Sequence, residues 1–249
     1  MAAADWPQSA HVPPLPRDEV HVWQSALDRD AGAVLMLEGL LATEERERAG
    51  RFHFRKDRER YVVGRGLLRW LLGEYLRVEP VGVRLWYTSH GKPEVVGETS
   101  ETAIKFNVAH SGSLILFAVT RGRDLGVDVE QLRPGVECRN LAARYFAPRE
   151  AAELTALAPE IQERAFFAGW TRKEAYMKAL GLGMAVPLDG FTVTLAPGRP
   201  AALVATDHDP AQLGRWELRE LDPAPGYAGA LAVEGTGWRV CYGRWEPFL

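Results

Sequence analysis

Hydrophobic and polar residues follow the helical period in two long segments of the chain. The first segment covers about residues 56–77, ends near Pro80 and has apolar positions at Tyr61, Leu67, Leu68, Leu71, Leu72 and Tyr75. The second segment covers about residues 160–180 and is stopped by Gly181 and Gly183, as is typical of a helix end. Because apolar residues three and four positions apart form one face of an amphipathic helix, the pattern predicts two long helices.

Short apolar or alternating segments between these helices predict strands. The apolar residues 32–41 are ambiguous between a strand and a loop, and Thr43 offers an N-cap for a further helix. Residues 1–20 hold four prolines and predict an irregular lead-in. Strands are expected at 21–23, 83–87, 104–108, 114–120, 125–130, 191–195, 201–204, 215–221, 227–233 and 238–242, and shorter helices at 137–146 and 148–157.

The order of these elements repeats faintly along the chain. In each half a long helix precedes a strand and then a glycine–base–proline turn, at residues 91–93 and 198–200. A bend of small residues later leads into a buried strand in each half. The repeat predicts an α+β fold of two similar halves related by a pseudo-two-fold axis, with a cleft between them. The expected division is a lead-in at 1–20, an N-terminal half at 21–130 and a C-terminal half at 131–249.

Composition narrows the class of protein. With 249 residues and 47% hydrophobic content, the chain has enough apolar side chains for a substantial core. A net charge of -3 disfavours general binding to nucleic acid. No apolar run approaches the length of a membrane span and no signal peptide is evident, so we expect a cytoplasmic protein without membrane contact. Cys138 and Cys241 lie far apart and indicate neither a disulfide framework nor a zinc site.

An acidic pair lies on the strand predicted at residues 125–130. Asp128 and Glu130 share one face of that strand, opposite Val127 and Val129. Side chains two residues apart on a strand are about 6.5–7 Å apart at the backbone, close enough to converge on one ion. The alternative is a solvated polar face, which the apolar surroundings of the strand disfavour.

A second charged row lies on the helix predicted at residues 160–180. Trp170, Glu174 and Lys178 recur every four residues and lie on one face. The alternative is a solvated ion pair worth about 0.3–0.5 kcal/mol. Because most of the helix is apolar, we instead expect partly buried charges that need partners. We expect Glu174 to meet Asp128 and Glu130 around one metal ion, and three carboxylates favour Mg²⁺, with Mn²⁺ also possible.

Basic residues dominate residues 46–69, where nine arginines and lysines face three acids. This segment is either a solvated helical face or an anion site, since the guanidinium group suits phosphate. Lys92 is held extended by Pro93, or is simply an exposed turn residue. His110 lies between two apolar strands, as a phosphate ligand or as a structural histidine. With Lys178, these groups favour metal-assisted attack on a polyphosphate ester.

Four motifs in this order have a specific resemblance. They are Gly91-Lys92-Pro93, Phe106-Asn107-Val108-Ala109-His110-Ser111-Gly112, Gly126-Val127-Asp128-Val129-Glu130, and Trp170-x-x-Lys173-Glu174-Ala175-x-x-Lys178-x-x-Gly181-x-Gly183. Together they resemble the 4'-phosphopantetheinyl transferases of the Sfp type, over about residues 43–235.

The resemblance implies a pseudo-dimeric α+β enzyme with coenzyme A and Mg²⁺ in the cleft. Such enzymes transfer the phosphopantetheine arm of coenzyme A to a serine of an acyl or peptidyl carrier protein, as in polyketide and nonribosomal peptide biosynthesis, and release 3',5'-ADP. By position, Asp128, Glu130 and Glu174 are expected to bind the metal, Glu174 to take the serine proton, and Lys178 to neutralise the leaving phosphate. The coenzyme A site is expected to include Arg48, Arg60, Lys92, Pro93, Asn107, Val108, Ala109 and His110.

Two positions depart from the family pattern. Ala109 stands where relatives often have serine, and Glu45 stands where they are commonly basic, which weakens the expected grip on the 3'-phosphate. Two other functions stay open, a Mg²⁺-dependent nucleotide pyrophosphohydrolase and a non-catalytic module that binds coenzyme A or a carrier protein. A monomer is expected, because two halves in one chain supply both walls of the cleft.

Overall fold

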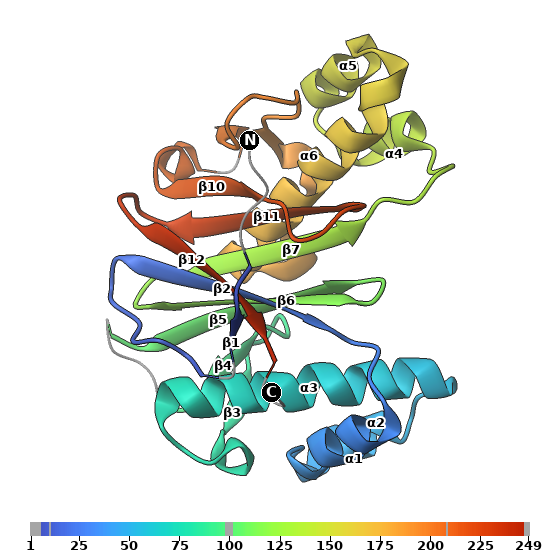
Figure 1. Cartoon of the computed structure of the whole chain (residues 1–249). Helices are drawn as coiled ribbons and strands as arrows, with labels where there is room; N and C mark the ends of the chain where they lie inside the picture. Colours follow the sequence, from blue (N-terminus) through green and yellow to red (C-terminus); the bar gives the residue numbers. More distant parts are fainter. Residues whose placement is uncertain (1–5, 10, 98–101, 208, 247–249) are drawn as a thin grey trace.

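The main elements form four stacked layers (Figure 1). The computed structural model describes residues 6–9, 11–97, 102–207 and 209–246. Helix α3 (Arg55–Leu76) covers a five-stranded sheet, a three-stranded sheet packs on the other face of the first, and helix α6 (Pro159–Leu180) covers the second sheet. Both long helices therefore lie where the hydrophobic pattern predicts them.

The five-stranded sheet has the order β1-β12-β2-β6-β5. Strands β2, β6 and β5 are antiparallel neighbours, whereas β12 runs parallel to both β1 and β2. The C-terminal strand thus completes the sheet that is otherwise built from the first half of the chain. The strands are β1 (Gln8–Ser9), β2 (Glu19–Ala26), β5 (Ile104–Ser111), β6 (Leu114–Arg121) and β12 (Arg239–Trp245).

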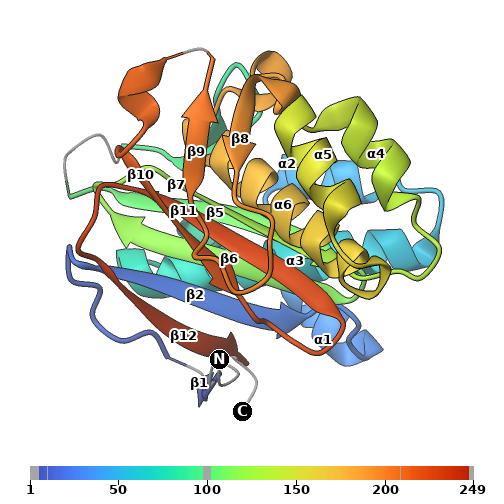
Figure 2. The same ribbon diagram turned by 90° about the horizontal axis from the view of Figure 1, so that it is seen from above.

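The three-stranded sheet has the order β10-β11-β7 and is antiparallel throughout. Its strands are β7 (Leu125–Gln131), β10 (Trp216–Leu221) and β11 (Tyr227–Glu234). Two small hairpins lie outside the main sheets, β3 (Leu85–Tyr87) with β4 (Pro93–Val95), and β8 (Phe191–Val193) with β9 (Leu203–Thr206). The view from above shows β8 and β9 beside α6 (Figure 2).

The remaining helices are α1 (Ala31–Gly39), α2 (Thr43–Ala49), α4 (Cys138–Tyr145) and α5 (Pro148–Ala156). Residues 32–41, for which the sequence favours a strand or a loop, instead lie mostly in helix α1, so that expectation is wrong. Asp30 caps α1 by accepting a bond from the Ala33 amide at 2.9 Å, whereas Leu35 and Met36 are exposed and obscure the helical pattern. Thr43 is the first helical residue of α2 and not its N-cap, which is Ala42.

The two halves repeat the same series of elements. The series β2, α1–α3, β3–β4, β5–β6 is followed by β7, α4–α6, β8–β9, β10–β11. The predicted fold class, α+β with two similar halves of a small, mostly antiparallel sheet and a long helix, is confirmed. A boundary at residue 130 separates the helices of the two halves, but two strand pairs cross it: β7 pairs with β11, and β12 pairs with β2.

Three apolar clusters hold the layers together. One lies between α3 and the first sheet, one between the two sheets, and one between the second sheet and α6. Val127 and Val129 belong to the cluster between the sheets, so Asp128 on the same strand faces α6, as the alternation predicted. Because of this order of layers, the face of β7 that carries Asp128 lies against helix α6.

Strand β7 lies directly against the backbone of α6. A Cβ atom on Gly126 would overlap the carbonyl oxygen of Ala175 and the amide nitrogen of Ala179. Only a residue without a side chain permits this approach. The close contact sets the separation between Asp128 on the strand and the last turns of the helix.

None of the helices within the described ranges combines the length and hydropathy that a membrane span requires. The predicted lead-in at residues 1–20 falls partly outside the described residues. Its described part includes β1, and the Trp6 indole donates to the Asp222 carbonyl at 3.1 Å. The N-terminal segment is thus tied to the loop after β10.

Replacing Gly126 by alanine is expected to destabilise the protein strongly. The added methyl group meets main-chain atoms that cannot move aside, and overpacking of this kind costs about 1–3 kcal/mol or more. Urea unfolding of Gly126→Ala measures the loss. Gly39→Ala is the matched control, because a Cβ atom there meets nothing within 4 Å and alanine favours a helix. Equal stability of the two variants would contradict the inferred close contact.

Candidate active site

Asp128 lies at the centre of the predicted acidic site. It is 5% exposed, and its Oδ1 atom accepts a bond from the Lys178 ammonium at 2.6 Å. Its Oδ2 atom is also buried and finds no hydrogen-bond partner among the described residues. A buried carboxylate oxygen without a partner is costly, and a catalytic role or a bound ion is one explanation for such an atom.

Two of the three predicted metal ligands, Asp128 and Glu174, have raised pKa values. Burial raises the pKa of Asp128 to about 7, against the attraction of Lys178, and the negative charges of Glu174 and Glu130 raise it further. Burial also raises the pKa of Glu174, and the charge of Glu130 adds to that rise. Strand β7 and helix α6 therefore bring Asp128, Glu130, Glu174 and Lys178 into one electrostatic unit.

These residues fit a hard divalent cation, although their carboxylates do not yet surround a single point. Within the described part of the chain, only Glu19, His21 and Cys241 bring three metal-ligating atoms within 4.8 Å of one another. The free Oδ2 atom of Asp128 and the oxygen-only donor set are the features that suit Mg²⁺.

Glu130 is held in place by the end of strand β5. The Ser111 hydroxyl donates to its Oε2 atom at 2.6 Å and accepts a bond from the Gln131 amide at 3.1 Å. Ser111 is 6% exposed, so this arrangement is mostly screened from water. Ser111 lies in a motif that carries the family resemblance, but the sequence offered no reason to pair it with Glu130.

Asn107 makes a second side-chain link between β5 and β7. Its Oδ1 atom accepts a bond from the Val127 amide at 2.9 Å. Asn107 is buried, and the Ala109 side chain packs in the cluster between the two sheets. These two side chains support the strand on which the acids lie, whereas Val108 packs towards the core under α3. Their assignment to coenzyme A stays a prediction.

His110 and Arg60 lie near the acidic site. His110 is exposed, yet its pKa is lowered, first by partial loss of solvation and then by the positive charges of Lys178 and Arg60. Arg60 forms a two-bond ion pair with Asp28 at 2.7 and 2.9 Å. The charges of both Lys178 and Arg60 therefore act on His110, but the guanidinium group of Arg60 is already paired with Asp28.

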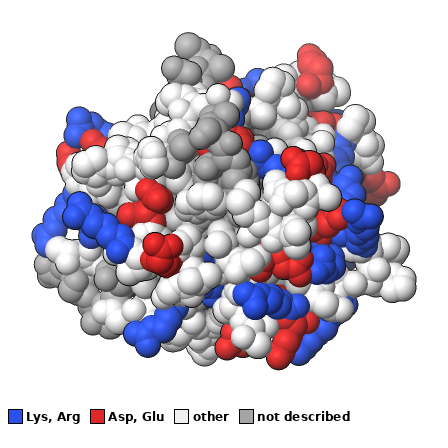
Figure 3. Space-filling view, turned by 60° about the horizontal axis from the view of Figure 1, so that its bottom comes forward, with Lys and Arg blue, Asp and Glu red and all other residues white. Residues whose placement is uncertain are grey.

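Most of the basic segment at residues 46–69 is neutralised by acids. The buried Glu45 contacts Arg69 at 2.5 Å and Arg65 at 3.5 Å, while Arg48 lies over the Tyr61 ring at 5.5 Å. Figure 3 shows basic and acidic side chains interspersed on the lower face of the molecule. Glu45 therefore lies in the α2–α3 contact, where it neutralises Arg65 and Arg69. Further pairs join Arg55 to Glu59 and Arg58 to Glu38.

Lys92 points into the protein. Its ammonium group donates to the carbonyl oxygens of Leu125 at 3.2 Å and Ala179 at 3.3 Å, and burial lowers its pKa. Lys92 and Pro93 line a small pocket next to β5. The lysine ties the β3–β4 hairpin to the start of β7 and the end of α6, so the structure does not place its amine beside Asp128.

Lys173, the other lysine of the helix motif, is fully buried. It contacts Glu150 of α5 at 2.7 Å and donates to the carbonyl oxygens of Leu188 at 2.8 Å and Phe191 at 2.5 Å. Its neighbour Glu174 lies close enough to Asp128 for its charge to raise the pKa of that carboxyl. One motif therefore combines a residue that fixes the helix with residues that form the site, a division that the spacing alone does not reveal.

Comparison with known proteins identifies the family. The sequence model for the 4'-phosphopantetheinyl transferase superfamily matches residues 124–232, and that for the N-terminal region of 4'-phosphopantetheinyl transferases matches residues 29–121. The 4'-phosphopantetheinyl transferase HetI of Nostoc sp. is 42% identical over 222 residues, which are 89% of this chain and 90% of that protein. The chain belongs to the 4'-phosphopantetheinyl transferase superfamily.

The resemblance to Sfp-type transferases is confirmed by a second relative. The 4'-phosphopantetheinyl transferase Sfp of Bacillus subtilis is 27% identical over 194 residues, which are 78% of this chain and 82% of that protein. The two family regions lie on either side of residues 122–123. Strand β7, with Asp128 and Glu130, therefore begins the region that also contains Glu174 and Lys178, and the protein is a transferase of this superfamily.

Loss of the Ser111 hydroxyl is expected to weaken the β5–β7 junction. Ser111→Ala leaves Glu130 without a donor and the Gln131 amide without an acceptor, which costs about 1–3 kcal/mol in the free energy of unfolding. Denaturant titration tests this, with Ser113→Ala as the control in the same turn. A loss no larger than that of the control would show that the two bonds contribute nothing to stability.

Removing the Lys173 ammonium is expected to lower the free energy of unfolding more than the loss of the Ser111 hydroxyl does. Lys173→Met leaves the Glu150 carboxyl buried beside apolar groups without its cation, and breaking a buried pair costs about 3–5 kcal/mol. Thermal and urea unfolding measure the change. The double variant Lys173→Met, Glu150→Gln is expected to regain part of the loss, because no buried charge is then left unpaired. A double variant less stable than Lys173→Met would contradict the ion-pair explanation.

Proposed function

We propose that this transferase moves the 4'-phosphopantetheine group from coenzyme A to a serine hydroxyl of an apo acyl or peptidyl carrier protein, with Mg²⁺ bound at the acidic site. The serine oxygen forms a new bond to the phosphorus that carries the pantetheine arm. The bond from that phosphorus to the bridging oxygen breaks, and 3',5'-ADP leaves. The serine proton passes to a base, so charge and atoms balance.

The observation that best supports this proposal is the buried Oδ2 atom of Asp128, which has no hydrogen-bond partner in the described part of the chain, while Oδ1 pairs with Lys178. Together with Glu130 and Glu174, Asp128 supplies an oxygen-only site for a cation that also binds a pyrophosphate. When bound, Mg²⁺ neutralises charge on the pyrophosphate oxygens. Lys178 supplies a second positive charge for the departing phosphate. Ser111 orients Glu130 within this set.

Glu174 is the proposed general base. It lies on α6 next to the acidic pair, and its raised pKa makes the carboxylate a better proton acceptor near neutral pH. The proton moves from the attacking serine oxygen to Glu174, directly or through one water. Asp128 is a poorer candidate, because one oxygen is already bonded to Lys178 and the side chain is buried.

For coenzyme A we propose that His110, with Arg60 and Arg48, binds the phosphates, and that Lys92 and Pro93 line the adenine site. Arg60 would have to exchange part of its pairing with Asp28 for the 3'-phosphate. Asn107, Val108 and Ala109 contribute through the backbone of β5, since their side chains are turned into the protein. A cytoplasmic location and a monomeric state stay predictions.

Intact-mass analysis of a purified apo carrier protein tests the proposed transfer. Incubation with this protein, coenzyme A and Mg²⁺ is expected to add one phosphopantetheine group to the carrier serine. Glu174→Gln is expected to slow the transfer by about 10²–10⁴-fold. Glu160→Gln, an exposed glutamate at the start of the same helix, is the matched control and is expected to keep full activity.

Other outcomes distinguish the alternatives. Cleavage of coenzyme A without a mass gain on acyl or peptidyl carriers would favour a pyrophosphohydrolase. Binding of coenzyme A without cleavage or transfer would indicate a non-catalytic module. Transfer that persists in a chelator would remove the proposed role of Mg²⁺, and full activity of Glu174→Gln would remove the proposed base.

A further inference from the structure

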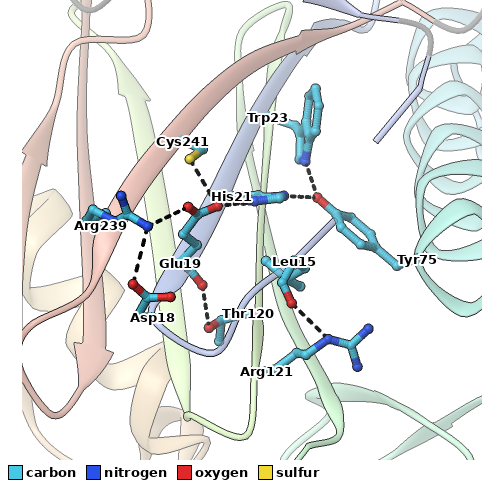
Figure 4. A network of polar contacts seen from close by, with 10 residues as sticks. All are labelled: Leu15, Asp18, Glu19, His21, Trp23, Tyr75, Thr120, Arg121, Arg239 and Cys241. Carbon is cyan, nitrogen blue, oxygen red and sulfur yellow. Dashed lines mark hydrogen bonds and ion pairs between the residues drawn. The ribbon is translucent and has the colours of Figure 1, made fainter. Parts of the chain in front are cut away.

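A second polar cluster lies at the other end of strand β2 from the Ser111 turn. Glu19 and His21 lie on β2, and Cys241 lies on β12 directly opposite His21 in the parallel pair (Figure 4). His21 is fully buried, whereas the Glu19 side chain is 17% exposed and Cys241 is half-buried. The cluster is therefore enclosed on the side of the histidine and open to solvent on the side of the carboxylate.

The distances within the cluster match those of a metal site. His21 Nε2 lies 3.2 Å from Glu19 Oε2, Cys241 Sγ lies 3.4 Å from the same oxygen, and all three ligand atoms lie within 4.8 Å of one another. Zinc bonds of about 2.0–2.2 Å to nitrogen or oxygen and about 2.3 Å to sulfur place tetrahedral ligands about 3.3–3.6 Å apart. The separation between sulfur and oxygen, 3.4 Å, already lies in this range, and that between nitrogen and oxygen, 3.2 Å, is about 0.1 Å below it.

Outer partners hold both the histidine and the carboxylate. His21 Nδ1 lies 2.7 Å from the Tyr75 hydroxyl, whose oxygen also accepts a bond from the Trp23 indole at 2.7 Å. The second carboxylate oxygen, Glu19 Oε1, accepts a bond from Arg239 at 3.0 Å. Metal-bound histidines and carboxylates generally have such partners, which fix their orientation. This cluster has them before any ion binds.

The charge balance also suits a divalent cation. A Cys241 thiolate, the Glu19 carboxylate and the nearby Asp18 carry three negative charges, and Arg239, which contacts both acids, carries one positive charge. The net charge of minus two equals what one divalent ion neutralises. Mixed sulfur, nitrogen and oxygen ligands favour Zn²⁺ over Mg²⁺ or Ca²⁺.

We propose that Glu19, His21 and Cys241 form a binding site for Zn²⁺ or a similar divalent transition metal, separate from the transferase site. The ion would clamp the C-terminal strand β12 to β2 within the first sheet, with its fourth position open to solvent. The proposal rests on the geometry of the cluster and not on the proposed transfer reaction, so the two can fail separately.

When the metal binds, the Cys241 thiol loses its proton and the ring proton of His21 moves from Nε2 to Nδ1. Burial raises the pKa of the Cys241 thiol, so its proton is lost only when the metal takes its place. In the bonding pattern without metal, the Tyr75 hydroxyl donates to Nδ1 and the Nε2 proton points to Glu19. With the metal on Nε2, the neutral ring carries its proton on Nδ1 and donates it to the Tyr75 oxygen.

Titration with Co²⁺ tests the site directly. The purified, reduced protein is expected to bind one Co²⁺ with a cobalt–thiolate charge-transfer band and the strong visible bands of a tetrahedral site, and Zn²⁺ is expected to displace it. Excess Mg²⁺ in all samples occupies carboxylate sites without competing for thiolate. Zn²⁺ is also expected to raise the midpoint of thermal unfolding as its concentration rises.

Matched variants identify the ligands. Cys241→Ala is expected to lose the thiolate band and the stabilisation by Zn²⁺, while Cys138→Ala, which removes the other free thiol, keeps both. Glu19→Gln is expected to weaken Co²⁺ binding at least tenfold, in line with the loss of one charged ligand. Absence of the band in the unaltered protein, its persistence in Cys241→Ala, or unchanged affinity in Glu19→Gln would overturn the proposal and leave the cluster as a hydrogen-bond network.

Discussion

The site depends on the direct contact between strand β7 and helix α6. Gly126 lets the strand backbone lie against the backbone of Ala175 and Ala179, closer than any residue with a side chain would allow. At this separation Asp128 meets Lys178 at 2.6 Å, one turn of helix away from Glu174. A wider gap between the layers would return the aspartate to water and remove both the ion pair and the shift in its pKa.

The edge strand β5 adds a second constraint, because it brings side chains from the first half of the chain to the acidic strand. Asn107 and Ser111 both accept bonds from main-chain amides of β7, and Ser111 also donates to Glu130. The acids therefore lie on a strand held on one side by a helix of the second half and on the other by a strand of the first. A site built in this way is complete only when both halves are folded together.

Buried charge has two different uses in this molecule. Lys173 with Glu150, and Arg69 with Glu45, are closed pairs whose remaining polar atoms also find partners, and they fix helices in place. Asp128 differs because one of its oxygens is left unpartnered within the described structure. That free oxygen separates Asp128 from these two closed pairs, although the buried Arg172, paired with Glu220, also has an unpartnered Nε atom among the described residues.

Sequence patterns alone predict both long helices, nearly all the strands, the opposite facing of Asp128 and Val127, and the family. Those features follow from local periodicity and ordered motifs, which need no knowledge of distant contacts. Tertiary structure decided that Lys173 is structural, that Glu45 neutralises arginines, and that Cys241 meets His21 across a strand pair. Tertiary packing decides which residues far apart in the chain come into contact, and the local sequence around one residue does not predict these contacts.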